Sequence, residues 1–140
     1  MLAHPAVVHL PIAFALFGPP LGLGLWLLTR AHPELHRLRL LLVFWQLALS
    51  TTLYAAMFTG EMAEDRPGFP PSNAALEAHQ VHEEYAELFF LLSLAAIPLA
   101  VFAVKSKGAG AILLLALYQT LLLGLCVYVG YLGGRITHGV

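Results

Sequence analysis

The chain has 140 residues, of which 59% are hydrophobic and 11% charged, with a net charge of -1 and a mean hydropathy of +0.79. This length suits one domain, but the composition lies outside the range of soluble proteins. The small net charge carries no information about partners. We therefore expect a single membrane-embedded domain.

Four long stretches contain no Asp, Glu, Lys or Arg, and each has the roughly 20 residues that a membrane-spanning helix needs. Helices are expected because an open sheet leaves backbone groups unsatisfied in lipid. The predicted fold is an all-α integral membrane four-helix bundle covering 1–140, with spans at about 5–29, 39–60, 79–104 and 108–134. The first span begins near Met1 without a basic region or a small-residue cleavage site, so we expect a retained helix rather than a signal peptide.

The first span contains prolines, and the second contains polar residues. Pro11 and the cluster Gly18-Pro19-Pro20 predict a kink or broken turn in the first span. In the second, we expect four polar side chains to hydrogen-bond across helices or to their own backbone: Gln46, Ser50, Thr51 and Thr52.

The connection from Gly60 to Ala78 contains Pro67-Gly68-Phe69-Pro70-Pro71, which forbids a continuous helix. Ser72 or Asn73 could cap the start of the third helix. In that helix His79 and His82 share a face, and Glu83 lies one turn from His79. Polar groups near the bilayer core are costly, so this placement indicates a ligand, a proton relay or a structural hydrogen bond.

The fourth span ends in several glycines, which a basic residue follows. Gly130, Gly133 and Gly134 recur at helical spacing, which permits close helix packing or the close approach of a flat ligand. Arg135 and His138 follow. The single cysteine, Cys126, is expected to be a small buried apolar residue.

The distribution of basic residues predicts the orientation in the membrane. The loops 30–39 and 105–110 contain five of the seven Lys and Arg residues, so the positive-inside rule places them in the cytoplasm. The expected location is the bacterial inner membrane, multi-pass, with both termini on the outer, periplasmic side.

This topology would gather five of the seven histidines at the outer end of the bundle: His4, His9, His79, His82 and His138. A single histidine is more often structural, but convergence from three helices favours a ligand site, since imidazole is the commonest metal ligand and bis-imidazole haem needs ligands on facing helices. A structural or proton-handling cluster remains the alternative. His32 and His36 lie in the opposite loop and are expected to be solvated.

Several motifs resemble the bacterial four-helix membrane family called domain of unknown function 2231. They are the opening His4-Pro5-Ala6-Val7-Val8-His9-Leu10-Pro11-Ile12-Ala13, Thr59-Gly60, His82 and the closing Gly133-Gly134-Arg135-Ile136-Thr137-His138-Gly139. The resemblance covers essentially the whole chain and implies redox work near haem, because some members are joined to cytochrome c modules. The chain departs from the usual pattern at Leu10 and at Ile136-Thr137, and neither change affects a histidine.

The leading hypothesis is a membrane-bound b-type haem protein that transfers electrons at the outer face. His9 and His82 would be the axial ligands, with His79, His138 and His4 as further ligands or neighbours. The three glycines would let the fourth helix approach the porphyrin, and Arg135 could pair with a propionate. Four aromatic residues could line the pocket, although each is also explained by ordinary packing: Phe14, Tyr85, Phe89 and Phe90.

Two alternatives remain open. One is a zinc, copper or iron ion bound by His9, His79, His82 and His138, with Glu83 as a ligand or orienting group. The other is a non-catalytic subunit that anchors a redox complex. A stand-alone enzyme is less expected, because the chain has no nucleophile elbow, phosphate loop or dinucleotide fingerprint.

The expected partners follow from these hypotheses. They are the lipid bilayer and a periplasmic cytochrome or quinol, with Glu61, Glu64 and Asp65 facing that partner. No nucleic acid is expected, and a homo-oligomer is left open.

Overall fold

The computed structural model describes residues 6–64, 73–106 and 108–138 and contains four long helices and one short one. They are α2 (His9–Ala31), the 3-10 helix η1 (Pro33–Arg39), α3 (Leu40–Glu64), α4 (Asn73–Lys105) and α5 (Gly110–His138). No strand occurs in these three ranges. The predicted all-α four-helix architecture is confirmed.

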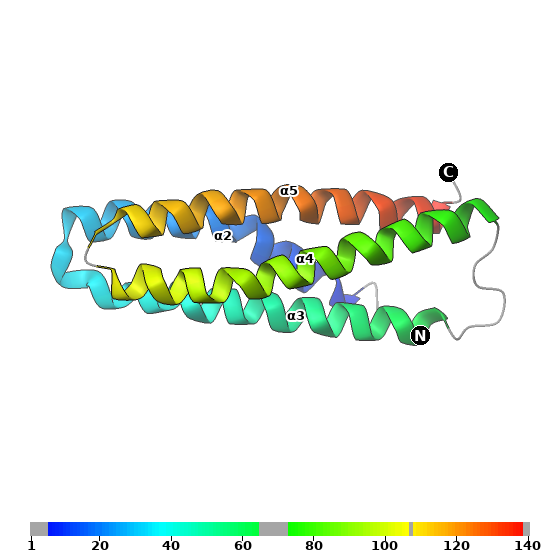
Figure 1. Cartoon of the computed structure of the whole chain (residues 1–140), viewed down its shortest axis with the longest axis horizontal. Coiled ribbons are helices and arrows are strands. Elements are labelled where there is room, and N and C mark those ends of the chain that lie inside the picture. The colour runs from blue at the N-terminus through cyan, green and yellow to red at the C-terminus, as the bar shows by residue number, and fades with distance from the viewer. Residues whose placement is uncertain (1–5, 65–72, 107, 139–140) are drawn as a thin grey trace.

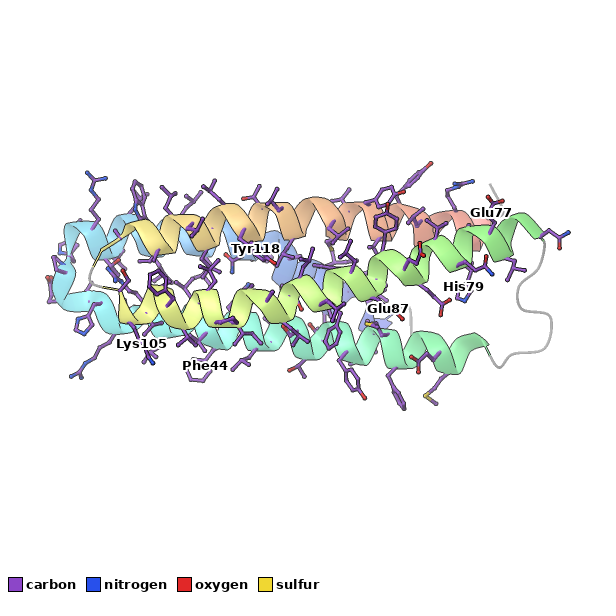
Figure 2. The ribbon with its side chains drawn as sticks, viewed as in Figure 1. Phe44, Glu77, His79, Glu87, Lys105 and Tyr118 are labelled. Carbon is purple, nitrogen blue, oxygen red and sulfur yellow. The ribbon has the colours of Figure 1, made fainter. Side chains whose placement is uncertain are left out.

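All four long helices are long and apolar enough to cross a membrane. Large apolar side chains cover the outside of the bundle, including Phe44 (66% exposed), Leu121 (72%) and Val127 (65%). Phe44 points away from the other helices (Figure 2). A soluble protein would not expose so many such side chains, so the four apolar helices and their apolar outer surface indicate a multi-pass membrane protein.

The helices run alternately up and down, as Figure 1 shows. Each helix packs against the next one in the chain, and α5 closes the ring by packing against α2. The start of α2, the end of α3, the start of α4 and the end of α5 therefore lie at one end of the bundle. We call this the histidine end, and the end formed by η1 and the α4–α5 turn the basic end. His79 and Lys105 mark the two ends in Figure 2.

Polar side chains inside the bundle bond across helices, as the sequence predicts. Gln46 of α3 donates to the carbonyl of Ser93 in α4 (2.9 Å), and the hydroxyls of Ser50 and Ser93 lie 3.0 Å apart. Thr52 donates to the backbone of its own helix, whereas Thr51 is exposed. These bonds give buried polar groups partners inside the bundle, although Oε1 of Gln46 has none among the described residues.

The helices are longer than the hydrophobic pattern predicts. Residues 61–64 are helical, although the sequence assigns them to a connection, and the basic loop 30–39 contains η1. Outside the bilayer core, water solvates charged side chains such as Glu61 and Glu77. The helices can therefore continue past the core. α4 begins at Asn73, a predicted start, and α2 continues unbroken through Pro19 and Pro20. The turn expected at Pro67–Pro71 lies outside the described residues.

Candidate functional site

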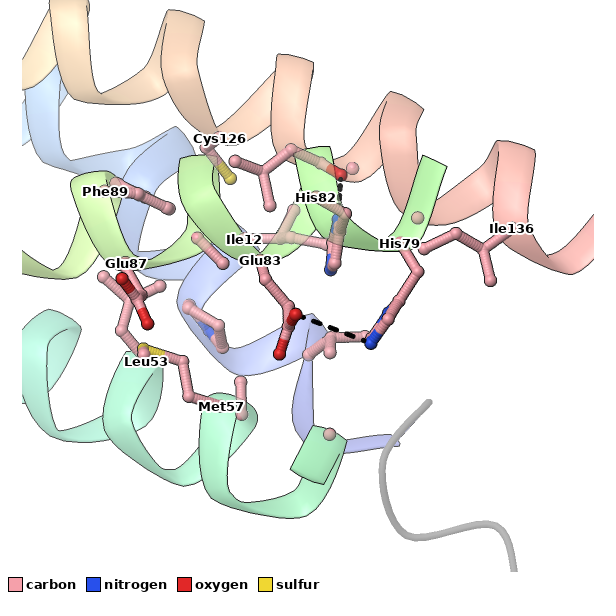
Figure 3. A pocket seen from close by; sticks show the side chains of 18 of the residues that line it. Ile12, Leu53, Met57, His79, His82, Glu83, Glu87, Phe89, Cys126 and Ile136 are labelled. Carbon is pink, nitrogen blue, oxygen red and sulfur yellow. Dashed lines mark hydrogen bonds and ion pairs between the residues drawn. The ribbon is translucent and has the colours of Figure 1, made fainter. Parts of the chain in front are cut away.

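A cavity of about 480 Å³ opens at the histidine end, and all four long helices contribute to it. Its volume lies in the range of about 300–1,000 Å³ that is typical of small-molecule sites. Most of its wall is apolar and includes Ile12, Leu53, Met57 and Phe89 (Figure 3). Its titratable lining residues are Glu61, His79, His82, Glu83, Glu87 and Cys126.

His82 is held in one orientation by a bond to the neighbouring helix. Its Nδ1 lies 3.0 Å from the main-chain oxygen of Val129 in α5. A carbonyl oxygen can only accept, so Nδ1 carries the proton, and in the neutral ring Nε2 carries the lone pair. Figure 3 shows this second nitrogen pointing away from α5 and into the cavity. Histidines that bind metals or haem usually have this arrangement, with the second nitrogen bonded to a carbonyl or carboxylate.

Three glycines of α5 shape the wall beside this ring. A Cβ at Gly133 would lie 3.3 Å from Cε1 of His82, whereas a Cβ at Gly130 or Gly134 would meet no atom within 4 Å. Gly133 therefore lets the imidazole lie directly on α5 and reach Val129. Gly130 and Gly134 instead leave open space in the cavity wall. Both predicted roles of the glycines, close packing and room for a ligand, are compatible with this arrangement.

His79 and Glu83 form an ion pair at the same cavity, with Nε2 of His79 3.7 Å from Oε2 of Glu83 when the histidine is protonated. The two residues are one helical turn apart on α4. The His79 side chain is only 13% exposed, while that of Glu83 is 49% exposed. The pair therefore lies between the cavity and its surroundings.

The structure brings together six of the residues that the sequence selects for a cofactor or metal site: His79, His82, Glu83, Gly130, Gly133 and Gly134. His9 and Arg135 are exposed and do not line the cavity, although Val8 and Ile12 on either side of His9 do. His4 and the side chain of His138 lie outside the described residues. At the basic end, His36 is exposed and His32 pairs with Glu34 (3.2 Å).

Sequence reasoning missed part of the cavity wall. Glu87 follows Glu83 by four residues, so the helical period could have found it. Glu61 and Met57 could not be found, because their place depends on how α3 packs against α4. Cys126 is buried as expected, but it also lines the cavity. Of the four predicted aromatic residues only Phe89 does so; Phe14 packs against Trp45 and Tyr85 against Tyr128.

A bound metal ion needs several ligands at one point. Within the described ranges, no group of three or more His, Cys, Asp and Glu side chains could hold a metal ion. His79, His82 and Glu83 share the cavity without converging on one position. The site as described has the form of a ligand pocket with one oriented imidazole.

No family model, no curated protein and no solved structure was found to match the chain. The resemblance to the domain of unknown function 2231 family therefore stays a prediction. The function has to be inferred from the geometry of the site itself.

Proposed function

We propose that this protein is a membrane-bound redox protein of the cytochrome b type, which binds haem in the cavity at the histidine end with His82 as an axial ligand. The observation that carries the proposal is the bond from Nδ1 of His82 to the carbonyl of Val129. It orients the ring, so that Nε2 can bind iron without a change of tautomer.

The rest of the cavity suits a flat apolar group. Its wall is mostly apolar, and the open space at Gly130 and Gly134 lets such a group lie against α5. The haem would supply the one-electron chemistry, since its iron changes oxidation state. The protein would fix the ring position, exclude water through Leu53 and Phe89, and handle protons at His79 and Glu83.

A second histidine ligand would have to come from another helix, because His79 projects from the same helix as His82, one turn away. We propose His9 as the second ligand, as the sequence predicts, since its neighbours Val8 and Ile12 already line the cavity. Binding would then require the start of α2 to turn His9 inward.

The charged residues at the two ends of the bundle suggest how the protein would be oriented and what partner it would meet. With the basic end in the cytoplasm, the haem would lie near the periplasmic face of the bacterial inner membrane. Exposed acidic residues at this end, Glu61, Glu77 and Glu84, would attract a periplasmic cytochrome with a basic face.

An absorption spectrum of the protein purified from haem-replete cells tests the proposal. We expect a sharp Soret band that is lost in His82→Ala and retained in His36→Ala, whose histidine lies at the other end. A low-spin spectrum that becomes high-spin in His9→Ala would assign the second ligand. Purified protein without a Soret band, after reconstitution with haemin as well, would exclude the proposal.

Quinol binding is a second candidate, and the ion pair between His79 and Glu83 favours it. One quinol hydroxyl could donate a hydrogen bond to Nε2 of His82, and the other polar groups of the quinol could bond to the ion pair. In that case a quinone analogue should bind to the protein without haem, Glu83→Gln should weaken its binding, and His82→Ala should prevent it. Absence of analogue binding to the haem-free protein would exclude this candidate.

A further inference from the structure

At the basic end of the bundle, Arg39 is a buried charge, with only 5% of its surface exposed. Its Nε donates to Oγ1 of Thr29 in α2 (3.4 Å), and its Nη1 donates to the carbonyl of Ser106 after α4 (2.7 Å). The Thr29 hydroxyl in turn donates to the carbonyl of Leu25 (2.8 Å). Arg39 thus holds the ends of two helices together.

These contacts leave the charge of Arg39 without a counterion. Both partners are neutral, and in the described ranges no carboxylate lies within ion-pair distance of it. A guanidinium has five N–H donors, and the two bonds use two of them. Burying a charge is costly unless it is paired, so this position favours an anion supplied from outside the chain.

A cavity of about 460 Å³ borders Arg39 and has room for such an anion. Among the residues that the structure describes, no acidic side chain lines it, whereas Arg30, Arg39 and Lys105 bring three permanent positive charges and His36 adds an imidazole. Ala109, directly before the start of α5, also lines the cavity, so the positive end of that helix dipole adds to the potential. Arg30 also packs over Trp26, with its guanidinium carbon 5.5 Å from the ring centre.

We propose that this basic cavity binds the phosphate group of an anionic phospholipid. The free donors of Arg39 match the geometry of phosphate oxygens, and Arg30 and Lys105 would surround the headgroup. A lipid is favoured over a free ion because the cavity lies at the ends of the spanning helices. Exposed Leu35 and Leu38 on η1, together with Trp26, mark this level as the membrane interface. Basic pockets between spanning helices are a known form of lipid recognition.

The test is the thermal unfolding of the full-length protein in neutral detergent, titrated with phosphatidylglycerol, phosphatidylcholine or inorganic phosphate. Phosphatidylglycerol should raise the Tm in a saturable way, and the other two should not. The variant Arg30→Gln with Lys105→Gln keeps the structural bonds of Arg39 and should bind phosphatidylglycerol about 25-fold more weakly, at about fivefold for each charge. Arg39→Gln should remove the effect altogether if it folds.

The matched control is Arg37→Gln compared with Arg30→Gln, since Arg37 is an exposed residue at the same end that does not line the cavity. Its affinity for phosphatidylglycerol should equal that of the unchanged protein, whereas Arg30→Gln should bind about fivefold more weakly. Equal weakening in the two single variants would show attraction by net charge alone and overturn the proposal. A rise in Tm that inorganic phosphate reproduces would show a free-anion site and overturn the assignment to lipid.

Discussion

The Nδ1 atom of His82 lies 3.0 Å from the main-chain oxygen of Val129, across the interface between α4 and α5. This bond couples the orientation of the proposed haem ligand to the packing of two helices. The ring lies on the surface of α5 at position 133, where a Cβ would be 3.3 Å from Cε1 and would push the ring away by a few tenths of an ångström. The glycine is therefore part of the site although it has no functional group.

Replacing Gly133 by alanine should displace the His82 ring, because the new Cβ would lie 3.3 Å from Cε1. The ring can rotate, so we expect weaker haem binding rather than unfolding. The ¹⁵N NMR signals of the His82 ring in the haem-free protein should show a protonated Nδ1 before the change and an altered tautomer mixture after it. Gly124→Ala is the control, since its Cβ would meet no atom within 4 Å, and it should raise stability by up to about 1 kcal/mol. Unchanged His82 signals in Gly133→Ala would contradict the role of Val129.

A substitution that fills the cavity should abolish haem binding without preventing folding. Gly130 lines the cavity and has open space above it, so Gly130→Leu should fold normally and lose haem binding. Gly124→Leu adds the same side chain at a position that does not line the cavity, and it should keep the Soret band. Equal haem content in the two variants would place the haem elsewhere.

Where residues share one helix, the sequence predicted which of them lie together. The spacing of His79, His82 and Glu83 places them on one face of α4, and the structure has all three in the cavity wall. The sequence could not predict the bond of His82 to Val129, because that bond depends on how far α4 is shifted along its axis relative to α5. Nor could it predict that His9 lies outside the cavity while Val8 and Ile12 line it.

Arg39, at the basic end of the bundle, is a second residue whose position the sequence could not predict. From the sequence it is one of several basic residues in a connecting loop that the positive-inside rule places in the cytoplasm. The 3-10 helix η1 instead turns it inward, so that it is buried between Thr29 and Ser106. Hydrophobicity predicts which segments cross the membrane, but the burial of a single charge depends on tertiary packing.

Gln119 should be a source of instability in the bundle. It is 2% exposed, and neither Nε2 nor Oε1 of its amide has a partner among the described residues. An unsatisfied buried polar group costs about 1–3 kcal/mol, so Gln119→Met should raise the Tm. Gln46→Met should lower it, because Gln46 donates to the carbonyl of Ser93. A lower Tm in Gln119→Met would mean that a bound water satisfies the amide in the protein.

The orientation of the bundle can be tested by labelling single cysteines in a Cys126→Ala background. Glu77 is exposed at the histidine end and Glu34 at the basic end. If the basic end is cytoplasmic, an impermeant maleimide should label Glu77→Cys in intact spheroplasts and Glu34→Cys only after lysis. The opposite pattern would reverse the proposed topology.

The last prediction concerns the distance over which electrons can move. The rise of a helix is 1.5 Å per residue, so about 35 Å of α4 separates His82 from Lys105. In the described ranges, no histidine lies along this path that could hold a second haem, since His32 and His36 are at its far end. Proteoliposomes with a reductant on the basic side and an impermeant acceptor on the histidine side should show almost no transfer. With reductant and acceptor both on the histidine side, transfer should be fast and should disappear in His82→Ala. Fast transfer across the membrane that needs His82 would require a second cofactor near the basic end and would contradict a haem at one face only.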